Sequence, residues 1–365
     1  MFYKALVRPW LFQTDPEAAH DRALNLAASL GRSRILCDTI ETVSAFEDRR
    51  LRQTIFGIEF PNPVGLAAGY DKNALGLDLW PALGFGFAEI GSVTLRGQPG
   101  TEPPRVFRQI EQRALINRMG FNNDGAEAIA ARIPPSPHRI PIGINIGKNR
   151  DVDLANAGED YAATMERFRD RADFFVINVS SPNTPGLRKL QDRGMLDGLL
   201  GEVSGGRGSR RAAPQPNGSP GGSPSNGKPI LLKIAPDLTF DQIDDVVALV
   251  QKHKLAGVVA TNTTIDHPSP SWGGLSGAPL RGRSTECVRH IRRQTNGQVP
   301  IIGVGGVFTA EDAYEKIRAG ASLVEVWTGM IYEGPAIVRT INRELLRLLE
   351  RDGFGSMAEA VGTEQ

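Results

Sequence analysis

Residues 174–188, FFVINVSSPNTPGLR, join a buried-strand pattern to side chains that could do chemistry. The first half is apolar and β-branched, and the second half contains Ser180, Ser181, Asn183 and Thr184. A simple turn needs only one or two small polar residues. The run therefore favours hydroxyls and amides that line a site where the strand ends, although hydrogen bonds that merely close the strand are the alternative.

Other polar residues follow apolar runs in the same way. Lys72 follows AAGYD, Asn145 lies in GINIGKN, Asn262 lies in ATNTT, and Asn117 lies in LINRMG. This set is rich in amides and lysines and almost free of carboxylates and histidine. It suits a flat, hydrogen-bonding ligand with anionic parts. It does not suit glycoside hydrolysis, which needs paired carboxylates, nor a serine hydrolase, because no G-x-S-x-G motif surrounds either serine.

Polar residues inside apolar runs are stronger candidates for a functional role than polar residues that could face solvent. Lys233 in LLKIA and Asn178 in VINVS lie within apolar runs, where an unpaired polar group is costly. A functional role is favoured for both. Lys72 could instead form a surface ion pair with Asp71, and Asn117 could be a turn residue.

Glycines indicate a phosphate site. Gly277 lies in GGLSGAPL, and Gly306 lies in GVGGVFT, just before a helix expected to begin near Thr309. Glycine amides near a helix N-terminus bind phosphate, and (β/α)₈ barrels often place such a site after strands seven and eight. A phosphate-bearing cofactor is expected, but glycine-rich turns are common and the signal is weak alone.

Eight short apolar runs must position these residues. They do not alternate with polar residues, so both faces should be buried, which is typical of parallel strands. Helical stretches capped by Thr239 and Thr309 lie among them. The pattern predicts an α/β fold, a (β/α)₈ TIM barrel, in which active residues gather at the strands' C-terminal ends. An open doubly wound sheet is the rival. The runs are 63–69, 87–93, 141–147, 174–181, 229–235, 257–264, 300–307 and 323–329.

Residues 1–45 lie outside the predicted barrel, which we assign to 46–350. Leu6 and Trp10 lie on one side of a first short helix, and Asp15-Pro16 begins a second. These amphipathic helices could pack on the barrel or form a membrane-touching cap with an apolar channel. Residues 204–228 read as a flexible Gly/Ser/Pro-rich loop, and 351–365 as a C-terminal tail.

Composition excludes several classes of protein. The chain has 365 residues and a net charge of +1, so it lacks the excess of basic residues that nucleic-acid binding requires. Two distant cysteines and five unclustered histidines give no metal spacing and fit a reducing compartment. No signal peptide and no run of about 20 apolar residues is visible. We therefore expect a cytoplasmic prokaryotic protein.

Nine strings together resemble the dihydroorotate dehydrogenases, over about residues 2–350. The family is an FMN-dependent (β/α)₈ barrel that oxidises (S)-dihydroorotate to orotate in pyrimidine synthesis, and the resemblance implies the same here. The strings are INVSSPNTPGLRKLQ, GLAAGYDKN, EIGSVT, LINRMGFNN, GINIGKN, KIAPDLT, ATNTT, GGLSGAPL and PIIGVGG.

The family has a soluble class with a cysteine base and a membrane-associated, quinone-reducing class with a serine base. Ser181 occupies the base position here, and the helices of 1–45 also resemble the quinone class. The resemblance thus implies a quinone acceptor and a peripheral location on the cytoplasmic face of the cell inner membrane. A soluble fumarate- or NAD-linked member, another FMN barrel oxidoreductase, and a binding barrel without chemistry are the alternatives.

The resemblance also implies residue roles. Ser181 is the expected base, with Thr184 helping to relay the proton away. Lys233 matches a residue beside the flavin ring, and His20 and Arg108 match residues at the quinone end. Trp327 departs from the usual tyrosine, which puts quinone contact in doubt. Expected cofactor-binding residues are Ala67, Ala68, Gly69, Asp71, Ser92, Asn145, Asn178, Lys233, Thr261, Gly277, Gly306, Trp327 and Thr328. Expected substrate-binding residues are Lys72, Asn117, Arg118, Met119, Gly120, Phe121, Asn178, Asn183, Asn262 and Thr263.

Overall fold

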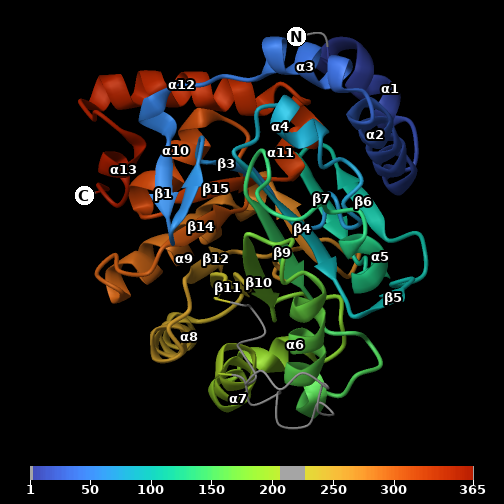
Figure 1. Ribbon diagram of the computed structural model, residues 1–365, viewed down its shortest axis with the longest axis vertical. Helices are drawn as coiled ribbons and strands as arrows, with labels where there is room; N and C mark the ends of the chain where they lie inside the picture. Colours follow the sequence, from blue (N-terminus) through green and yellow to red (C-terminus); the bar gives the residue numbers. More distant parts are fainter. Residues whose placement is uncertain (1–2, 206–226, 365) are drawn as a thin grey trace.

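A computed structural model describes residues 3–205 and 227–364. Eight parallel strands close into a barrel in the order β10-β11-β12-β14-β15-β3-β4-β9 (Figure 1). Each predicted apolar run contains one of these strands, so the (β/α)₈ barrel is confirmed over the open sheet. The strands are β3 (Val64–Leu66), β4 (Phe87–Val93), β9 (Ile142–Ile146), β10 (Phe174–Asn178), β11 (Ile230–Ile234), β12 (Gly257–Ala260), β14 (Ile301–Val304) and β15 (Leu323–Val326).

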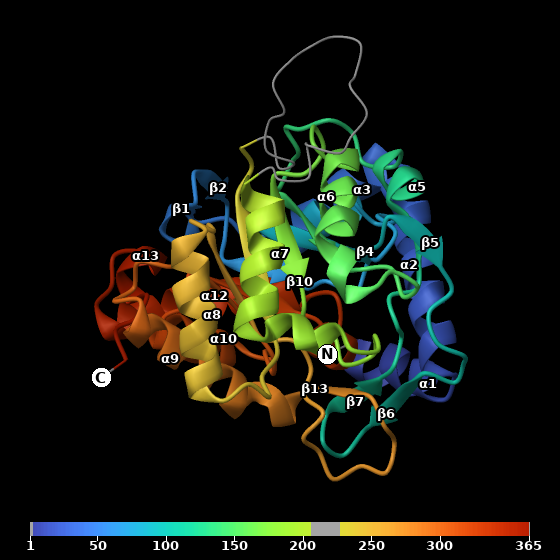
Figure 2. The same cartoon turned by 90° about the horizontal axis from the view of Figure 1, so that it is seen from below.

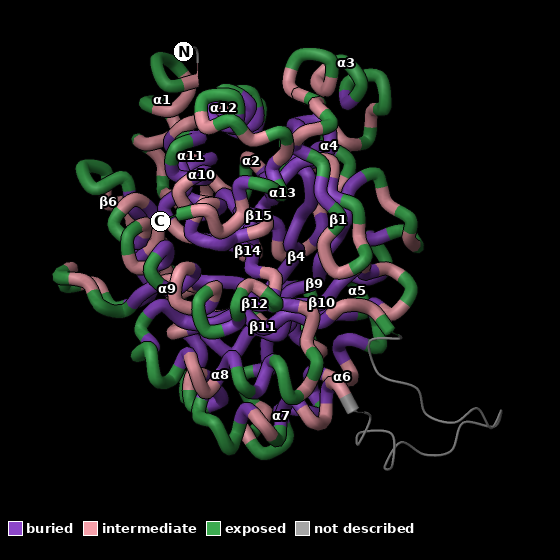
Figure 3. Tube along the Cα trace, turned by 90° about the vertical axis from the view of Figure 1, so that its left-hand side faces the viewer, coloured by how far each residue is buried: buried purple, intermediate pink, exposed green. Residues whose placement is uncertain are grey.

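The barrel strands are buried on both faces, as their non-alternating sequences require. They form the purple centre of the tube in Figure 3. Phe87, Phe174, Val176, Leu231 and Ile302 fill the inside. Helices cover the outside: α4 (Leu79–Ala82), α5 (Ala126–Ala130), α6 (Ala157–Arg167), α7 (Arg193–Gly205), α8 (Phe240–Lys252), α9 (Arg281–Gln294), α10 (Ala310–Ala319), α11 (Thr328–Glu333) and α12 (Ile337–Asp352).

The predicted caps of α8 and α10 are confirmed. Thr239 and Thr309 each accept a hydrogen bond from the amide three residues ahead, in reciprocal capping boxes with Gln242 and Asp312. These caps satisfy amides that would otherwise lack partners at the helix start. They fix where each helix begins, and hence the length of the loop that precedes it.

Five helical segments of the described residues precede the barrel: η1 (Tyr3–Val7), α1 (Arg8–Phe12), α2 (Pro16–Gly31), α3 (Arg34–Ser44) and the short η2 (Arg49–Leu51). Asp15 caps α2 as predicted, whereas the sequence analysis did not single out α3. Arg105 binds Glu17 of α2, with Nη2 2.7 Å from Oε1. Arg108 donates to the Thr14 carbonyl at 2.6 Å. These contacts hold the helices beside β6 (Val106–Gln109) (Figure 1).

A small antiparallel sheet adjoins these helices. β6 pairs with β7 (Ala114–Asn117), and β7 pairs with β13 (Gly274–Gly277) (Figure 2). The register sets Asn117 opposite Gly274. Two further pairs are β1 (Gln53–Ile55) with β2 (Ile58–Phe60) and β5 (Arg96–Gln98) with β8 (Asn123–Gly125).

The predicted loop 204–228 begins at the end of α7, and a last segment of the chain follows α12. Of the predicted loop 204–228, residues 206–226 lie outside the described residues. After α12 the chain forms α13 (Met357–Ala360), and the Glu364 amide donates to the Arg318 carbonyl on α10 at 2.9 Å. No helix in the described ranges is both long and apolar enough to cross a membrane.

Candidate functional site

One cavity of about 820 Å³ begins at the C-terminal ends of the barrel strands and extends beneath α1, α2 and α3. It brings together most of the residues that the sequence analysis selected. Those lining it are His20, Ala67, Ala68, Gly69, Lys72, Ser92, Arg108, Asn117, Met119, Gly120, Phe121, Asn178, Ser181, Asn183, Lys233, Thr261, Asn262, Thr263, Gly277, Gly306, Trp327 and Thr328.

Five selected residues do not line the cavity. Asp71 points its carboxylate into its own loop, where it accepts from the Gly76 amide at 2.8 Å and from Trp80 Nε1 at 3.0 Å. It therefore shapes the loop after β3. Arg118 donates to a backbone carbonyl of the loop before β6 at 2.9 Å and is exposed at its tip. The other three are Asn145 and Ser180, which are both hydrogen-bonded to the lining residue Asn178, and Thr184, which follows Asn183 in the chain.

Asn178, at the end of β10, is the centre of an amide network. Its Nδ2 donates to Ser92 Oγ at 2.9 Å and to Asn145 Oδ1 at 3.1 Å. Its Oδ1 accepts from the Ser180 amide at 3.1 Å. Asn262 Nδ2 donates to Ser180 Oγ at 3.0 Å. The network fixes side chains from β4, β9, β10 and the loop after β12, so the polar wall is organised in advance of any ligand.

Ser181 is buried, with 6% of its surface exposed. Its Oγ accepts from the Asn183 amide at 3.3 Å, and Asn183 Nδ2 donates to Asn117 Oδ1 at 3.1 Å. Thr184 Oγ1 and Asn183 Oδ1 are buried and have no hydrogen-bond partner among the described residues. Because buried polar atoms are normally paired, these two atoms are available to a ligand or a water path.

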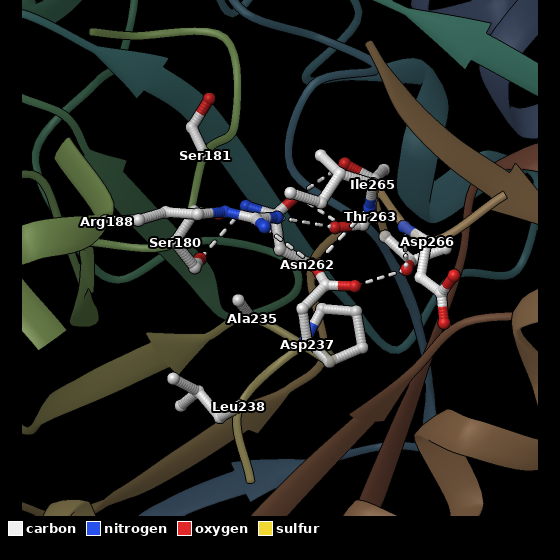
Figure 4. Close-up of polar contacts among 12 residues, drawn as sticks. Ser180, Ser181, Arg188, Ala235, Asp237, Leu238, Asn262, Thr263, Ile265 and Asp266 are labelled. Carbon is white, nitrogen blue, oxygen red and sulfur yellow. Dashed lines mark hydrogen bonds and ion pairs between the residues drawn. The ribbon is translucent and has the colours of Figure 1, made fainter. Parts of the chain in front are cut away.

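Arg188 holds three strand-end loops together, a role that the sequence analysis missed. Its Nε donates to the Ser180 carbonyl at 2.9 Å, its Nη2 donates to the Thr263 carbonyl at 2.9 Å, and its Nη1 lies 2.6 Å from Asp237 Oδ2. Figure 4 shows the Ser181 hydroxyl directed away from this cluster. The available signal was an arginine directly after the run of small polar residues.

Lys233 projects from β11 between two buried carboxyl groups. Its Nζ lies 2.8 Å from Glu89 Oε1 and 3.6 Å from Glu325 Oε2, and both glutamates are inaccessible to solvent. Burial lowers the pKa of Lys233, but the two carboxyl groups outweigh burial and raise it. Lys233 therefore stays charged. The sequence analysis missed both glutamates, although EIGSV and LVEVW bury an acid as LLKIA buries its lysine.

Lys72 and His20 stand where the polar wall meets the apolar passage. Burial lowers the pKa of Lys72 to about 8, and no carboxylate lies within ion-pair distance of it in the described part of the chain. Burial and then the Lys72 charge lower the pKa of His20 to about 3, so its ring is neutral. The His20 ring stacks on Trp327 with centroids 6.3 Å apart and meets Tyr70 edge-on at 5.1 Å.

The opposite end of the polar wall has glycines and hydroxyls. Gly277 and Gly306 have φ of 106° and 73°, which L side chains rarely adopt. A Cβ on Gly277 would lie 2.4 Å from the Arg113 carbonyl oxygen. Nearby, Thr328 Oγ1 donates to Ser276 Oγ at 2.9 Å. Glycine backbone and hydroxyls at this end, with amides and Lys233 at the other, fit a flat polar ring that carries a phosphate.

The N-terminal helices give the rest of the cavity apolar walls. Leu11, Ala23, Ala27 and Leu30 line it. Several large apolar side chains of the same helices remain exposed to solvent. Leu6 at 63% and Ile35 at 78% do not line the cavity, whereas Trp10 at 57%, Leu26 at 59% and Val43 at 60% do.

Known proteins resemble the chain over nearly its whole length. A family model described as "Dihydroorotate dehydrogenase" matches residues 50–349. A protein of Gloeobacter violaceus named dihydroorotate dehydrogenase (quinone) is 48% identical over 362 residues, 98% of either chain. One of the same name from Thermus thermophilus is 48% identical and covers 96% of this chain and 98% of that one. A crystal structure of Eimeria tenella DHODH in complex with ferulenol superposes with a TM-score of 0.80 at 37% identity, covering 96% of this chain and 95% of that one.

Proposed function

Since the chain belongs to the dihydroorotate dehydrogenase family, we propose that the flavin it holds is FMN and that the cavity described above is its active site. The family reaction is flavin-dependent. In the quinone class, to which the names of the full-length relatives belong, (S)-dihydroorotate is oxidised to orotate with a quinone as the electron acceptor, in pyrimidine biosynthesis. The carrying observation is that one cavity joins a wall of amides and lysines around Ser181 to an apolar passage beneath the N-terminal helices.

FMN would occupy the part of the cavity between the glycines and Lys233. Gly277, Gly306 and Thr328 would receive its phosphate, and Ser92, Asn178 and Thr261 would meet the ring. The unpartnered Thr261 Oγ1 supports this fit. When bound, FMN supplies the acceptor for the electron pair of dihydroorotate. The Lys233 charge would favour negative charge on an adjacent ligand.

Ser181 would act as the base, and amides would hold the substrate. Asn117, Asn183 and Asn262 offer donors and acceptors to the pyrimidine ring, and the lysine without a carboxylate partner, Lys72, would bind the substrate carboxylate. A serine hydroxyl is a weak base, so the proton needs an exit. Thr184 Oγ1, which is buried and has no partner among the described residues, is the hydroxyl that would receive it.

The apolar passage would admit the quinone. Neutral His20, the Trp327 ring and the aliphatic part of Arg108 would line its inner end, while Arg108 holds the end of α1. Trp327 lacks the phenol of a tyrosine, so the indole N–H is the one hydrogen-bond donor that its side chain offers the quinone. The exposed apolar side chains of η1, α1, α2 and α3 would enter the lipid interface at the cytoplasmic face of the inner membrane.

An assay with different electron acceptors distinguishes a quinone-linked enzyme from a soluble fumarate- or NAD-linked one. The purified protein should oxidise dihydroorotate with a short-chain ubiquinone analogue and show no turnover with fumarate or NAD. Turnover with either soluble acceptor at a rate equal to that with quinone would contradict the quinone assignment.

Membrane contact can be tested by Ile35→Glu. Losing one buried Ile side chain from a lipid interface costs about 1.5–3 kcal/mol. The affinity for anionic phospholipid vesicles, measured by co-sedimentation, should therefore fall about tenfold or more. Turnover with a water-soluble quinone should stay unchanged. Met195→Glu on α7, at the end of the molecule away from α3 (Figure 1), is the matched control and should bind vesicles like the unmodified protein. Equal weakening in both variants would remove α3 from the contact.

A further inference from the structure

Glu89, Lys233 and Glu325 form a charge cluster that the proposed reaction does not require in full. They come from β4, β11 and β15 and are buried together inside the barrel. Glu89 and Lys233 are the charged groups that face Glu325. Its neighbours on the adjacent strands, Val304 of β14 and Gly65 of β3, cannot ionise. The cluster is therefore electrostatically self-contained.

The hydrogen bonds divide unequally between the two acids. Glu89 Oε1 accepts from Lys233 at 2.8 Å and from Asn145 Nδ2 at 2.6 Å. Neither oxygen of Glu325 has a hydrogen-bond partner among the described residues, and its nearest approach to Lys233 is 3.6 Å. A buried ionised carboxylate without hydrogen bonds is strongly disfavoured. The single ammonium is already engaged by Glu89.

Charge counting leads to the same result. Two ionised acids and one ammonium would leave a net negative charge in the barrel, whereas one proton on Glu325 makes the cluster neutral. Burial, followed by repulsion from Glu89, raises the pKa of Glu325 well above its ordinary value, against the smaller lowering by Lys233. The geometry and the electrostatics agree on which acid carries the proton.

We propose that Glu325 holds a proton in the resting protein, so that it, Glu89 and Lys233 together carry no net charge beneath the cavity. Glu325 also lines that cavity. In the part that concerns the flavin, this inference rests on the proposed function. A protonated Glu325 leaves the Lys233 ammonium to favour an anionic ring, whereas an ionised Glu325 would oppose it.

The first test compares the pH dependence of stability in Glu325→Gln and the unmodified holoprotein. A raised native pKa means that the native state keeps a proton that the unfolded chain loses above about pH 4.3. Glu325 therefore contributes stability that is lost as pH rises, and a glutamine in its place makes no such contribution. The folding equilibrium constant of the variant, relative to the unmodified protein, should grow about tenfold per pH unit from about pH 5 until Glu325 ionises. A constant ratio from pH 5 to 8 would overturn the proposal.

Glu111→Gln, in the exposed turn between β6 and β7, is the matched control and should give a constant ratio. If Glu325→Gln does not fold, infrared spectroscopy of the unmodified protein replaces it. A protonated-carboxyl band should be present at pH 7 and shift in heavy water. It should vanish in Glu89→Gln, where Glu325 becomes the partner of Lys233 and ionises. A band that persists in Glu89→Gln, or is absent throughout, contradicts the proposal. A protein without flavin absorbance would sink the proposed function and leave both readouts intact.

Discussion

Replacing Ser181 by alanine should slow flavin reduction by dihydroorotate about 10²–10⁴-fold, the usual contribution of a positioned base. Among the described residues, the hydroxyl takes part in one hydrogen bond, which it accepts from the Asn183 amide, so its loss should disturb the fold little. Stopped-flow absorbance of the anaerobic protein measures the rate. The variant should retain its bound flavin and nearly unchanged saturation by dihydroorotate, because the amides and Lys72 remain in place.

Two further substitutions, Ser180→Ala and Ser181→Cys, show whether the slower flavin reduction comes from the loss of a base at Ser181. Ser180→Ala removes a hydroxyl that accepts from Asn262 and donates to Asn178, within the positioning network. Losing this hydroxyl should cost about 1 kcal/mol, which corresponds to a roughly fivefold slower flavin reduction. Ser181→Cys should restore part of the rate, with an increase as pH rises through the thiol pKa of about 8.5. Equal rates in Ser181→Ala and the unmodified protein, or a larger loss in Ser180→Ala, would contradict a base at Ser181.

Replacing Lys233 by methionine should be the most damaging change to stability. Within the described part of the chain, it removes the only ammonium in reach of the buried Glu89 and Glu325 carboxyl groups. Breaking a buried ion pair from one side costs about 3–5 kcal/mol. Chemical denaturation should show a loss of that size, and the variant should also bind flavin more weakly.

The control is a surface pair of the same kind. Lys252 binds Asp197 at 2.7 Å but is 59% exposed, so Lys252→Met should cost no more than about 1 kcal/mol. Adding Glu89→Gln to Lys233→Met should recover part of the lost stability, because no unpaired charge then remains in the barrel. If Lys233→Met and Lys252→Met cost the same, the cluster does not have the energetic role assigned to it.

The barrel could be read from the sequence because its signals are local. Non-alternating apolar runs mark strands buried on both faces, and capping residues such as Thr239 and Thr309 mark helix starts. Once eight parallel strands were expected, their C-terminal ends had to meet. Residues distant in sequence, such as Asn117, Asn178 and Lys233, could therefore be assigned to one site.

The pairings within the site could not be read in the same way. Glu89 and Lys233 are 144 positions apart, and only the closed barrel shows that they touch. Arg188 and Asp237 lie in loops whose approach depends on how β10, β11 and β12 end. Asp71 looked like a cofactor ligand because it sits in a matching motif, but its carboxylate is occupied by the amides of its own turn. Which way a loop side chain turns is decided by such contacts.

The most direct test of the account is the visible absorbance spectrum of the purified protein, recorded without oxygen before and after addition of dihydroorotate. We expect an oxidised flavin band that bleaches on addition of dihydroorotate and returns when a quinone is added. A protein with no flavin band, or with a band that dihydroorotate leaves unchanged, would contradict the claim that this cavity joins the substrate to a flavin.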